Sequence, residues 1–116
     1  NLLRFYDEWA GGEIDGIKLM PVLTEDIYEL YKAWCGRQGV KPSPLNRAID
    51  QLSKRPGMRK ERKRYVLSSV ASNPKFFLFP QRGEEMNPGN SESGWLGQCV
   101  DAFRQELNDY RGNRYG

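Results

Sequence analysis

The 116-residue chain contains no histidine and only two cysteines, and both shortages restrict the chemistry it can perform. Without histidine, neither a Cys–His nor a Ser–His–Asp catalytic group is possible, and a zinc site would have only thiols and carboxylates as ligands. Cys35 and Cys99 are not spaced like metal ligands. Each lies on an expected amphipathic helix, where a reduced thiol packs as a small hydrophobic group. We therefore expect no metal site and a reducing, intracellular compartment, with a disulfide as the alternative.

Other signatures of enzymes and membrane proteins are also missing. No glycine-rich phosphate-binding loop occurs, no apolar run approaches the roughly 20 residues of a membrane-spanning helix, and no signal peptide is recognisable. The acidic residues that stand out are adjacent pairs, whose side chains diverge on a helix: Asp7/Glu8, Glu25/Asp26 and Glu84/Glu85. The sequence thus predicts no catalytic residues, no cofactor and no membrane contact. Residue 1 is Asn, and we expect the chain to be a piece of a longer protein.

Positive charge is concentrated in one stretch of the sequence. Residues 54–64 carry seven positive side chains and one negative, a net +6 in a chain whose formal total is +3. The rest of the chain is therefore net acidic, and residues 1–30 alone hold seven acidic and two basic side chains. A dense cationic segment beside a helix suits a phosphate backbone. A solvated basic loop without a partner is the alternative.

The N-terminal part predicts two amphipathic helices joined by a short strand. Residues 2–10 carry one apolar stripe and end at a Gly-Gly pair, which predicts the first helix. Residues 17–22 suggest a short strand that a proline interrupts. Thr24 is the expected N-cap of the second helix, which we expect to end before Gly36 or Gly39.

A turn leads to a third helix over about residues 45–54. Ser43 is its expected N-cap, and Pro44 suits the first helical position because that position needs no N–H donor. Apolar and polar residues then separate onto two faces of the helix. The expected buried face comprises Leu45, Ala48, Ile49 and Leu52, and the exposed face comprises Asn46, Arg47, Asp50, Gln51 and Lys54.

A β-hairpin is predicted after the basic segment. Its strands are expected at residues 64–70 and 75–79, with the turn at residues 71–74. The second strand is an unbroken apolar run, so both of its faces need a cover.

Residues 81–93 are predicted to be a polar linker, and a last helix is expected over about residues 93–110. We expect this helix to cover the phenylalanine-rich strand through Trp95 and Phe103. Its apolar face comprises Leu96, Cys99, Val100, Phe103, Leu107 and Tyr110.

This order of elements predicts an α+β fold. The expected architecture is a winged helix-turn-helix, mostly helical, with a small antiparallel β-hairpin as its wing and an extra C-terminal helix. We expect residues 1–80 to form the winged-helix DNA-binding domain, residues 81–93 the linker, and residues 94–116 a C-terminal helix and tail that pack on the domain.

The third helix is the element expected to enter the major groove of double-stranded DNA, which is wide enough for one α-helix. Asn46 and Gln51 can pair with adenine and Arg47 with guanine. Ser43 and the first-turn N–H groups can hold a phosphate. Lys54 is a further recognition candidate on this helix. The remaining candidates are cations expected at the neighbouring DNA backbone or in the minor groove: Arg55, Arg59, Lys60, Arg62, Lys63 and Arg64. Taken singly, each of these is also an ordinary exposed residue, and Asp50 on the same face would repel phosphate.

A longer pattern in the chain resembles a known family, the C-terminal domain of phage and plasmid replicative primase–helicases of the superfamily III helicase type. The residues that match in order are Phe5-Tyr6-Asp7-Glu8, Ile27–Cys35, Gln38-Gly39, Pro42-Ser43, Leu52 and Arg64-Tyr65. The match covers roughly residues 2 to 70. It departs from the family where Ala48 or Ile49 replaces a frequent Phe, and the linker and last helix lie outside the pattern.

The resemblance implies a winged helix that binds double-stranded DNA at a replication origin. It also implies fusion to helicase or primase domains and a place in the cytoplasm of a bacterium or a phage-infected host. The residues themselves leave two alternatives open. One is a domain that docks on a protein partner, which the acidic N-terminal part and the aromatic strand at 76–79 favour. The other is single-stranded nucleic-acid binding by Tyr65 and the phenylalanine cluster, which requires exposed rings.

Overall fold

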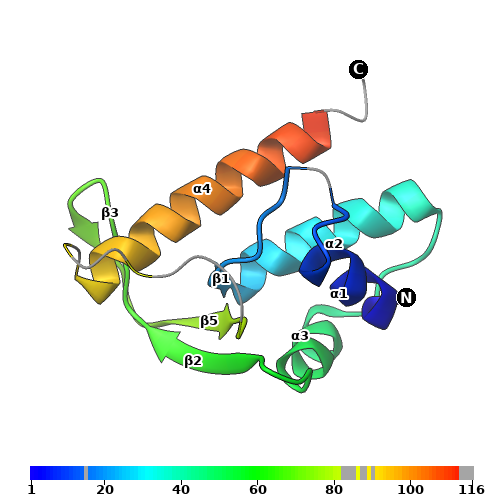
Figure 1. Ribbon diagram of the computed structural model, residues 1–116, viewed down its shortest axis with the longest axis horizontal. Coiled ribbons are helices and arrows are strands. Elements are labelled where there is room, and N and C mark those ends of the chain that lie inside the picture. Colours follow the sequence, from blue (N-terminus) through cyan, green and yellow to red (C-terminus); the bar gives the residue numbers. More distant parts are fainter. Residues whose placement is uncertain (15, 82–85, 87–88, 90, 113–116) are drawn as a thin grey trace.

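The apolar stripes of the N-terminal half form three helices: α1 (Leu2–Ala10), α2 (Thr24–Gln38) and α3 (Leu45–Ser53). They are seen in the computed structural model, which describes residues 1–14, 16–81, 86, 89 and 91–112 (Figure 1). α1 ends at the expected Gly-Gly pair, and α2 ends at Gly39, whose φ of 72° makes it a left-handed cap. All three helices bury their apolar faces in one main core cluster.

Both expected N-caps are wrong by one residue. α2 already includes Thr24, with Leu23 at the N-cap, and α3 has Pro44 at the N-cap in place of Ser43. Neither cap residue makes a side-chain hydrogen bond to the helix. Leu23 is still part of a strand, so the chain passes from strand to helix without a capping residue between them.

The sheet has the strand order β1-β5-β2, and all its pairings are antiparallel. β1 (Val22–Leu23) begins only after Pro21, so most of the strand expected at residues 17–22 is wrong. β2 (Arg59–Lys63) pairs along its whole length with β5 (Lys75–Phe79). The middle of the basic stretch, residues 59–63, is therefore an edge strand. Charged side chains are a common feature of edge strands, because they discourage pairing with other chains.

The same hairpin continues into a second, two-stranded sheet. β3 (Val66–Leu67) pairs with β4 (Val70–Ala71) around a turn at Ser68-Ser69. Both serines have left-handed φ angles, 53° and 65°, as in a two-residue hairpin turn of type I′. The turn expected at residues 71–74 is thus wrong, because the chain reverses earlier, at a pair without the glycine or asparagine that usually indicates such a turn.

The two faces of the three-stranded sheet belong to different core clusters. Val22 and Leu78 pair across β1 and β5, and both lie in the main cluster with α1, α2 and α3. Their neighbours Leu23 and Phe77 lie in a second cluster on the opposite face. Alternation along a strand explains this division. The expected α+β class is confirmed, with four helices and small antiparallel sheets in the described part of the chain.

α4 (Glu92–Gly112) covers the second face of the sheet and also contacts α2 (Figure 1). Leu96 and Val100 close the second cluster, whereas Phe103 lies in the main cluster, so the cover expected from Phe103 is wrong. The six residues of the expected apolar face are all buried. Most of the expected linker and the last four residues lie outside the described part of the chain.

Ion pairs join α4 to α2. The Arg104 side chain donates a 2.9 Å hydrogen bond to the buried Asp26 carboxylate, and Arg111 lies 2.8 Å from Glu29. Arg37 donates to the main-chain carbonyl of Tyr110 and stacks on its ring. Burial raises the pKa of Asp26, and the positive charge of Arg104 opposes that rise. These contacts fix α4 on the side of the molecule opposite α3.

Candidate nucleic-acid interface

The outward face of α3 is open to solvent. All five residues of the expected polar face, Asn46, Arg47, Asp50, Gln51 and Lys54, are exposed. Lys54 lies 3.0 Å from Asp50, and this pair offsets one positive charge against one negative charge. No carboxylate in the described part of the chain forms an ion pair with Arg47. The face thus presents two amides and one unneutralised guanidinium.

The start of α3 is fixed by tyrosines from α2. The Tyr28 hydroxyl donates a 2.9 Å hydrogen bond to the Ser43 carbonyl, and the Ser43 N–H donates a 3.1 Å bond to the Tyr31 hydroxyl. These bonds explain why Ser43 is not needed as a cap. Because its N–H is engaged, Ser43 can offer a phosphate only its hydroxyl. Leu45, expected to be buried, is 42% exposed, since contact with the core begins only at Ala48.

The cations of β2 divide between two faces of the strand. Arg59 lies 2.5 Å from Glu61, and Lys63 lies 3.1 Å from Glu92, so the cations on one face are paired with carboxylates. On the other face are Lys60 and Arg62. Within the described ranges, neither forms an ion pair with a carboxylate.

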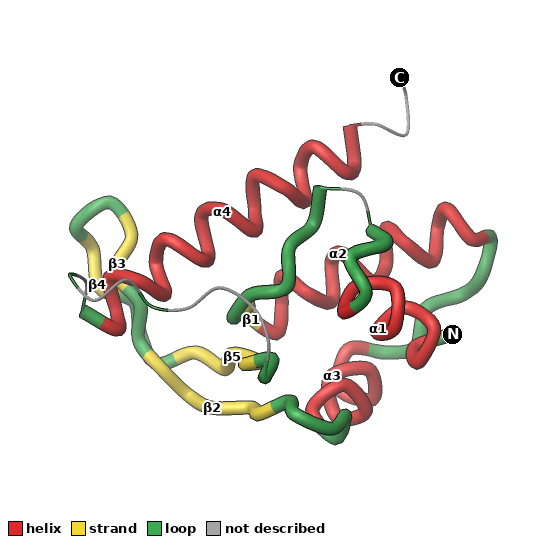
Figure 2. Tube along the Cα trace, viewed as in Figure 1, coloured by secondary structure: helices red, strands yellow, loops and turns green. Residues whose placement is uncertain are grey.

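Lys60 and Arg62 lie on the same face of the sheet as α3. Lys60 is the cross-strand partner of Leu78, whose side chain belongs to the main cluster with α1, α2 and α3. Directly paired residues of an antiparallel ladder point to the same side, and Arg62 follows Lys60 by two residues. Figure 2 shows α3 and β2 along the lower edge of the view, with β2 approaching α4 at its C-terminal end, where Lys63 pairs with Glu92. The outward face of α3 and two unneutralised cations are thus presented by neighbouring elements along this edge.

The remaining residues of the basic run occupy different surroundings. Arg64 is exposed between β2 and β3. Arg55 is half-buried and lies 5.7 Å from the ring centroid of Tyr6 in α1. Its Nε is buried and has no hydrogen-bond partner among the described residues. Arg55 therefore packs against α1 as well as adding charge near the C-terminal end of α3.

Phe76 belongs to this surface but was expected in the core. Its side chain is 47% exposed, while Phe77, Leu78 and Phe79 are buried. The Lys60 Nζ and Arg62 Cζ lie 5.2 and 5.6 Å from the centre of its ring. The sequence kept the whole phenylalanine cluster open as a single-strand binding surface, but an apolar run gives no sign of where its cover ends and so could not single out Phe76. The cations beside its ring are identified only by the strand register.

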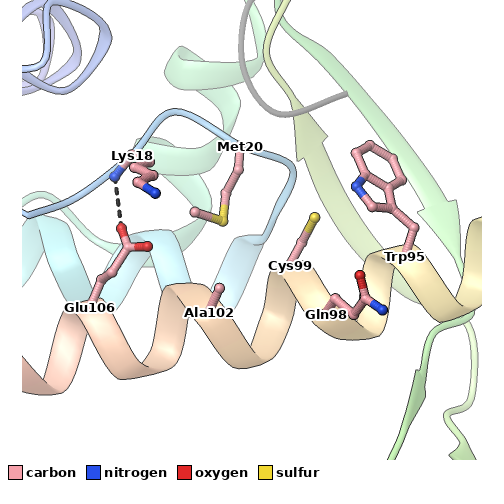
Figure 3. A pocket seen from close by; sticks show the side chains of 7 residues that line it. All are labelled: Lys18, Met20, Trp95, Gln98, Cys99, Ala102 and Glu106. Carbon is pink, nitrogen blue, oxygen red and sulfur yellow. Dashed lines mark hydrogen bonds between the residues drawn. The ribbon is translucent and has the colours of Figure 1, made fainter. Parts of the chain in front are cut away.

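A pocket of about 160 Å³ lies elsewhere, between α4 and the segment before β1 (Figure 3). Figure 3 shows the Cys99 thiol directed into the space between Met20 and Trp95. At one end of the pocket, the main-chain N–H of Lys18 donates a 2.8 Å hydrogen bond to the Glu106 carboxylate. These are the contacts that hold the segment to α4. The described residues contain no group of three or more side chains that could hold a metal ion.

Comparison with known proteins adds no relative: no family model matches the sequence, and no curated protein or solved structure is significantly similar to it. None of the helices in the described ranges combines the length and apolar character that crossing a bilayer requires. The functional argument therefore depends on the surface formed by α3 and β2.

Proposed function

We propose that this chain is a winged helix-turn-helix module that binds double-stranded DNA. The order of elements supports the fold: α1, β1, α2 and α3 are followed by a hairpin whose returning strand, β5, lies between β1 and β2. α2 and α3 form the helix-turn-helix, and the β2–β5 hairpin with its β3–β4 tip forms the wing. α4 is an addition that supports the wing from the opposite face.

The observation that carries the proposal is the shared surface of α3 and β2. The outward face of α3 would lie in the major groove, with Asn46, Arg47 and Gln51 at base edges. Lys60 and Arg62 on the same face of the sheet would contact the phosphate backbone beside the groove. The other proposed backbone contacts are Ser43, Lys54, Arg55, Arg59, Lys63 and Arg64, several of which are already paired with carboxylates or packed against other side chains.

The biological setting follows from the resemblance to replicative primase–helicases. We propose that the module recognises a replication origin and acts within a longer phage or plasmid replication protein. On this reading it is non-catalytic, and the helicase or primase activity belongs to other domains.

Salt dependence of DNA affinity tests the proposal. If about 5 phosphates are neutralised, a plot of log affinity against log salt concentration falls with a slope of about −4 to −5. Replacing Lys60 and Arg62 together by glutamine removes two phosphate contacts and reduces the steepness of the slope by about 2.

A matched control removes two charges beside α4. The main-chain N–H of Lys18 is bonded to Glu106, and the Lys32 ammonium lies 3.0 Å from Glu29, the partner of Arg111. Replacing both by glutamine changes the net charge as much but leaves the slope unchanged if the α3–β2 surface binds DNA. The proposal is contradicted if both double variants lose the same steepness of salt dependence, or if the DNA affinity of the wild type barely responds to salt. Either result favours docking on a protein partner.

A further inference from the structure

Phe76 is the one member of its strand's apolar run that the fold does not cover. It lies on β5, the central strand of the sheet, where its exposed fraction is 47%. A single exposed hydrophobic residue is common on protein surfaces and does not by itself indicate a site. Phe76 differs because it lies within the surface assigned to DNA, where an exposed ring can contact the nucleic acid.

The ring of Phe76 lies close to two cations. Arg62 is its direct cross-strand partner, and Lys60 is the diagonal neighbour on the same face. Their charged ends lie 5.6 and 5.2 Å from the ring centre, and neither is paired with a carboxylate in the described ranges. The strand pairing holds all three side chains on a regular ladder. Aromatic surface and positive charge are therefore presented together.

This combination matches the chemistry of an unpaired nucleotide. Proteins that bind single strands place bases on aromatic rings while cations hold the neighbouring phosphates. In a duplex, each base face is covered by the next base pair, so the ring can stack only on a base that is unpaired. A partner with apolar side chains alone would leave Lys60 and Arg62 without a counter-charge.

We propose that Phe76 stacks on an unpaired base of a strand that leaves the duplex bound by α3, while Lys60 and Arg62 keep their contacts with the phosphates of the same backbone at the point where it leaves the duplex. This inference rests on the proposed function, because it places the single strand beside a bound duplex. The preferred ligand is then a junction between double-stranded and single-stranded DNA rather than a continuous duplex.

Affinity for two DNA probes tests this inference, using the full chain. One probe is a blunt duplex, and the other is the same duplex with a short oligo-dT tail on one strand. Stacking energies for single bases correspond to about 5- to 150-fold in affinity. We expect wild type to bind the tailed probe more tightly than the blunt one, within that range. A 2-aminopurine base placed in the tail reports stacking independently through its fluorescence.

The variants Phe76→Leu and Phe76→Trp separate stacking from other roles of the ring. Leucine keeps apolar contact with the stems of Lys60 and Arg62 but cannot stack, so the gain from the tail, measured as the ratio of tailed to blunt affinity for the same variant, should disappear. Tryptophan should preserve the gain. If the tail adds no affinity, or if the leucine variant keeps the gain, the ring only covers the two cationic stems and the inference is overturned.

The same probes distinguish failure of the inference from failure of the proposed function. If the blunt duplex binds with the expected salt dependence but the tail adds no affinity, only the stacking site is contradicted. The oligo-dT strand alone serves as a third probe. If it binds as tightly as the tailed duplex, and Phe76→Leu abolishes this binding, the duplex proposal is overturned and the stacking site is supported. No binding to any probe overturns both.

Discussion

Gly97 of α4 lies against the main-chain carbonyl of Val66 in β3, so closely that a Cβ atom at position 97 would be 1.7 Å from the Val66 oxygen. No non-bonded pair of heavy atoms can approach to that distance. The absence of a side chain at Gly97 therefore allows the helix to rest directly on the hairpin. In the proposed fold this contact holds the tip of the wing.

Gly97→Ala is expected to destabilise the protein by at least about 2 kcal/mol, because α4 must move away from β3 and disturb the second cluster. Urea unfolding measures the change. The control is Gly36→Ala within α2, where nothing lies within 4 Å of an added Cβ. That variant should be unchanged or more stable by up to about 1 kcal/mol, since alanine is the better helix former. Similar losses at both positions would contradict the close packing of α4 on the hairpin.

Arg104 and Arg111 each form an ion pair with α2, but the pairs differ in burial. Arg104→Gln leaves the buried carboxylate of Asp26 without its cation, whereas Glu29, the partner of Arg111, has a side chain that is 41% exposed. We expect Arg104→Gln to lower the free energy of unfolding at neutral pH by about 1–2 kcal/mol, since water screens part of the interaction at this half-exposed arginine. Arg111→Gln should cost less than about 0.5 kcal/mol.

The pH dependence of the Arg104 variant has a defined sign. Burial raises the pKa of Asp26 above its ordinary value of 3.8, so the folded state holds this proton more tightly than the unfolded state. Stability from this group is greatest in acid and falls as the pH rises through the folded-state pKa. Removing Arg104 raises that pKa further. The difference between the variant and wild type, measured by urea unfolding, should therefore shrink as the pH is lowered to about 4. A difference that is constant with pH would mean that Arg104 acts by packing alone.

Helices were predictable from this sequence because each carries a strong local signal. The stripe of α1 and the six-residue apolar face of α4 repeat at helical spacing, and glycine follows α1 and α2. Helix starts were less predictable, because the turn before α3 is held by Tyr28 and Tyr31, which lie on the preceding helix. No pattern within residues 43–45 could reveal those tertiary hydrogen bonds.

The hairpin shows the limit of sequence reasoning more clearly. β2 has no apolar alternation, because it is an edge strand whose charged side chains are largely exposed and lie over the phenylalanine rings of β5. Its pairing with β5 depends on the partner strand rather than on its own composition. For the candidate surface, the polar residues of α3 were correctly expected to be exposed, although Leu45 was not, whereas the alignment of Lys60, Arg62 and Phe76 on one face required knowledge of the strand register.

The turn at Ser68-Ser69 is a place where the sequence is not optimal for its structure. Both residues have left-handed φ angles, which asparagine and glycine adopt more readily than serine. Replacing the pair by Asn-Gly should stabilise the protein by about 0.5–1 kcal/mol in urea unfolding. Ser68→Val should have the opposite effect, because a β-branched residue is strained in this region. If both changes were neutral, the hairpin tip would contribute nothing to the stability of the fold.

The base-reading role proposed for α3 predicts a separation between sequence preference and overall affinity. Arg47→Ala or Asn46→Ala should weaken discrimination at a single base pair by about 1–3 kcal/mol, because each removes a hydrogen-bonding group from the groove. Selection from a randomised duplex pool, followed by affinity measurements on single-base variants of the preferred site, gives both quantities. Gln105→Ala on α4 is the control, since this exposed amide bonds only to Asp101 among the described residues and lies away from α3.

Lys54 provides a further contrast on the same helix. Its ammonium group is 3.0 Å from the Asp50 carboxylate, so part of its charge is already neutralised in the free protein. Lys54→Gln should therefore reduce DNA affinity less than Lys60→Gln does, and Asp50→Asn should increase affinity by releasing the lysine and removing a repulsive charge. Both effects should grow as salt is lowered, because screening of exposed charges weakens. If Asp50→Asn instead lowered affinity at one base pair only, the carboxylate would be reading a cytosine amino group, and α3 would still be the element in the groove.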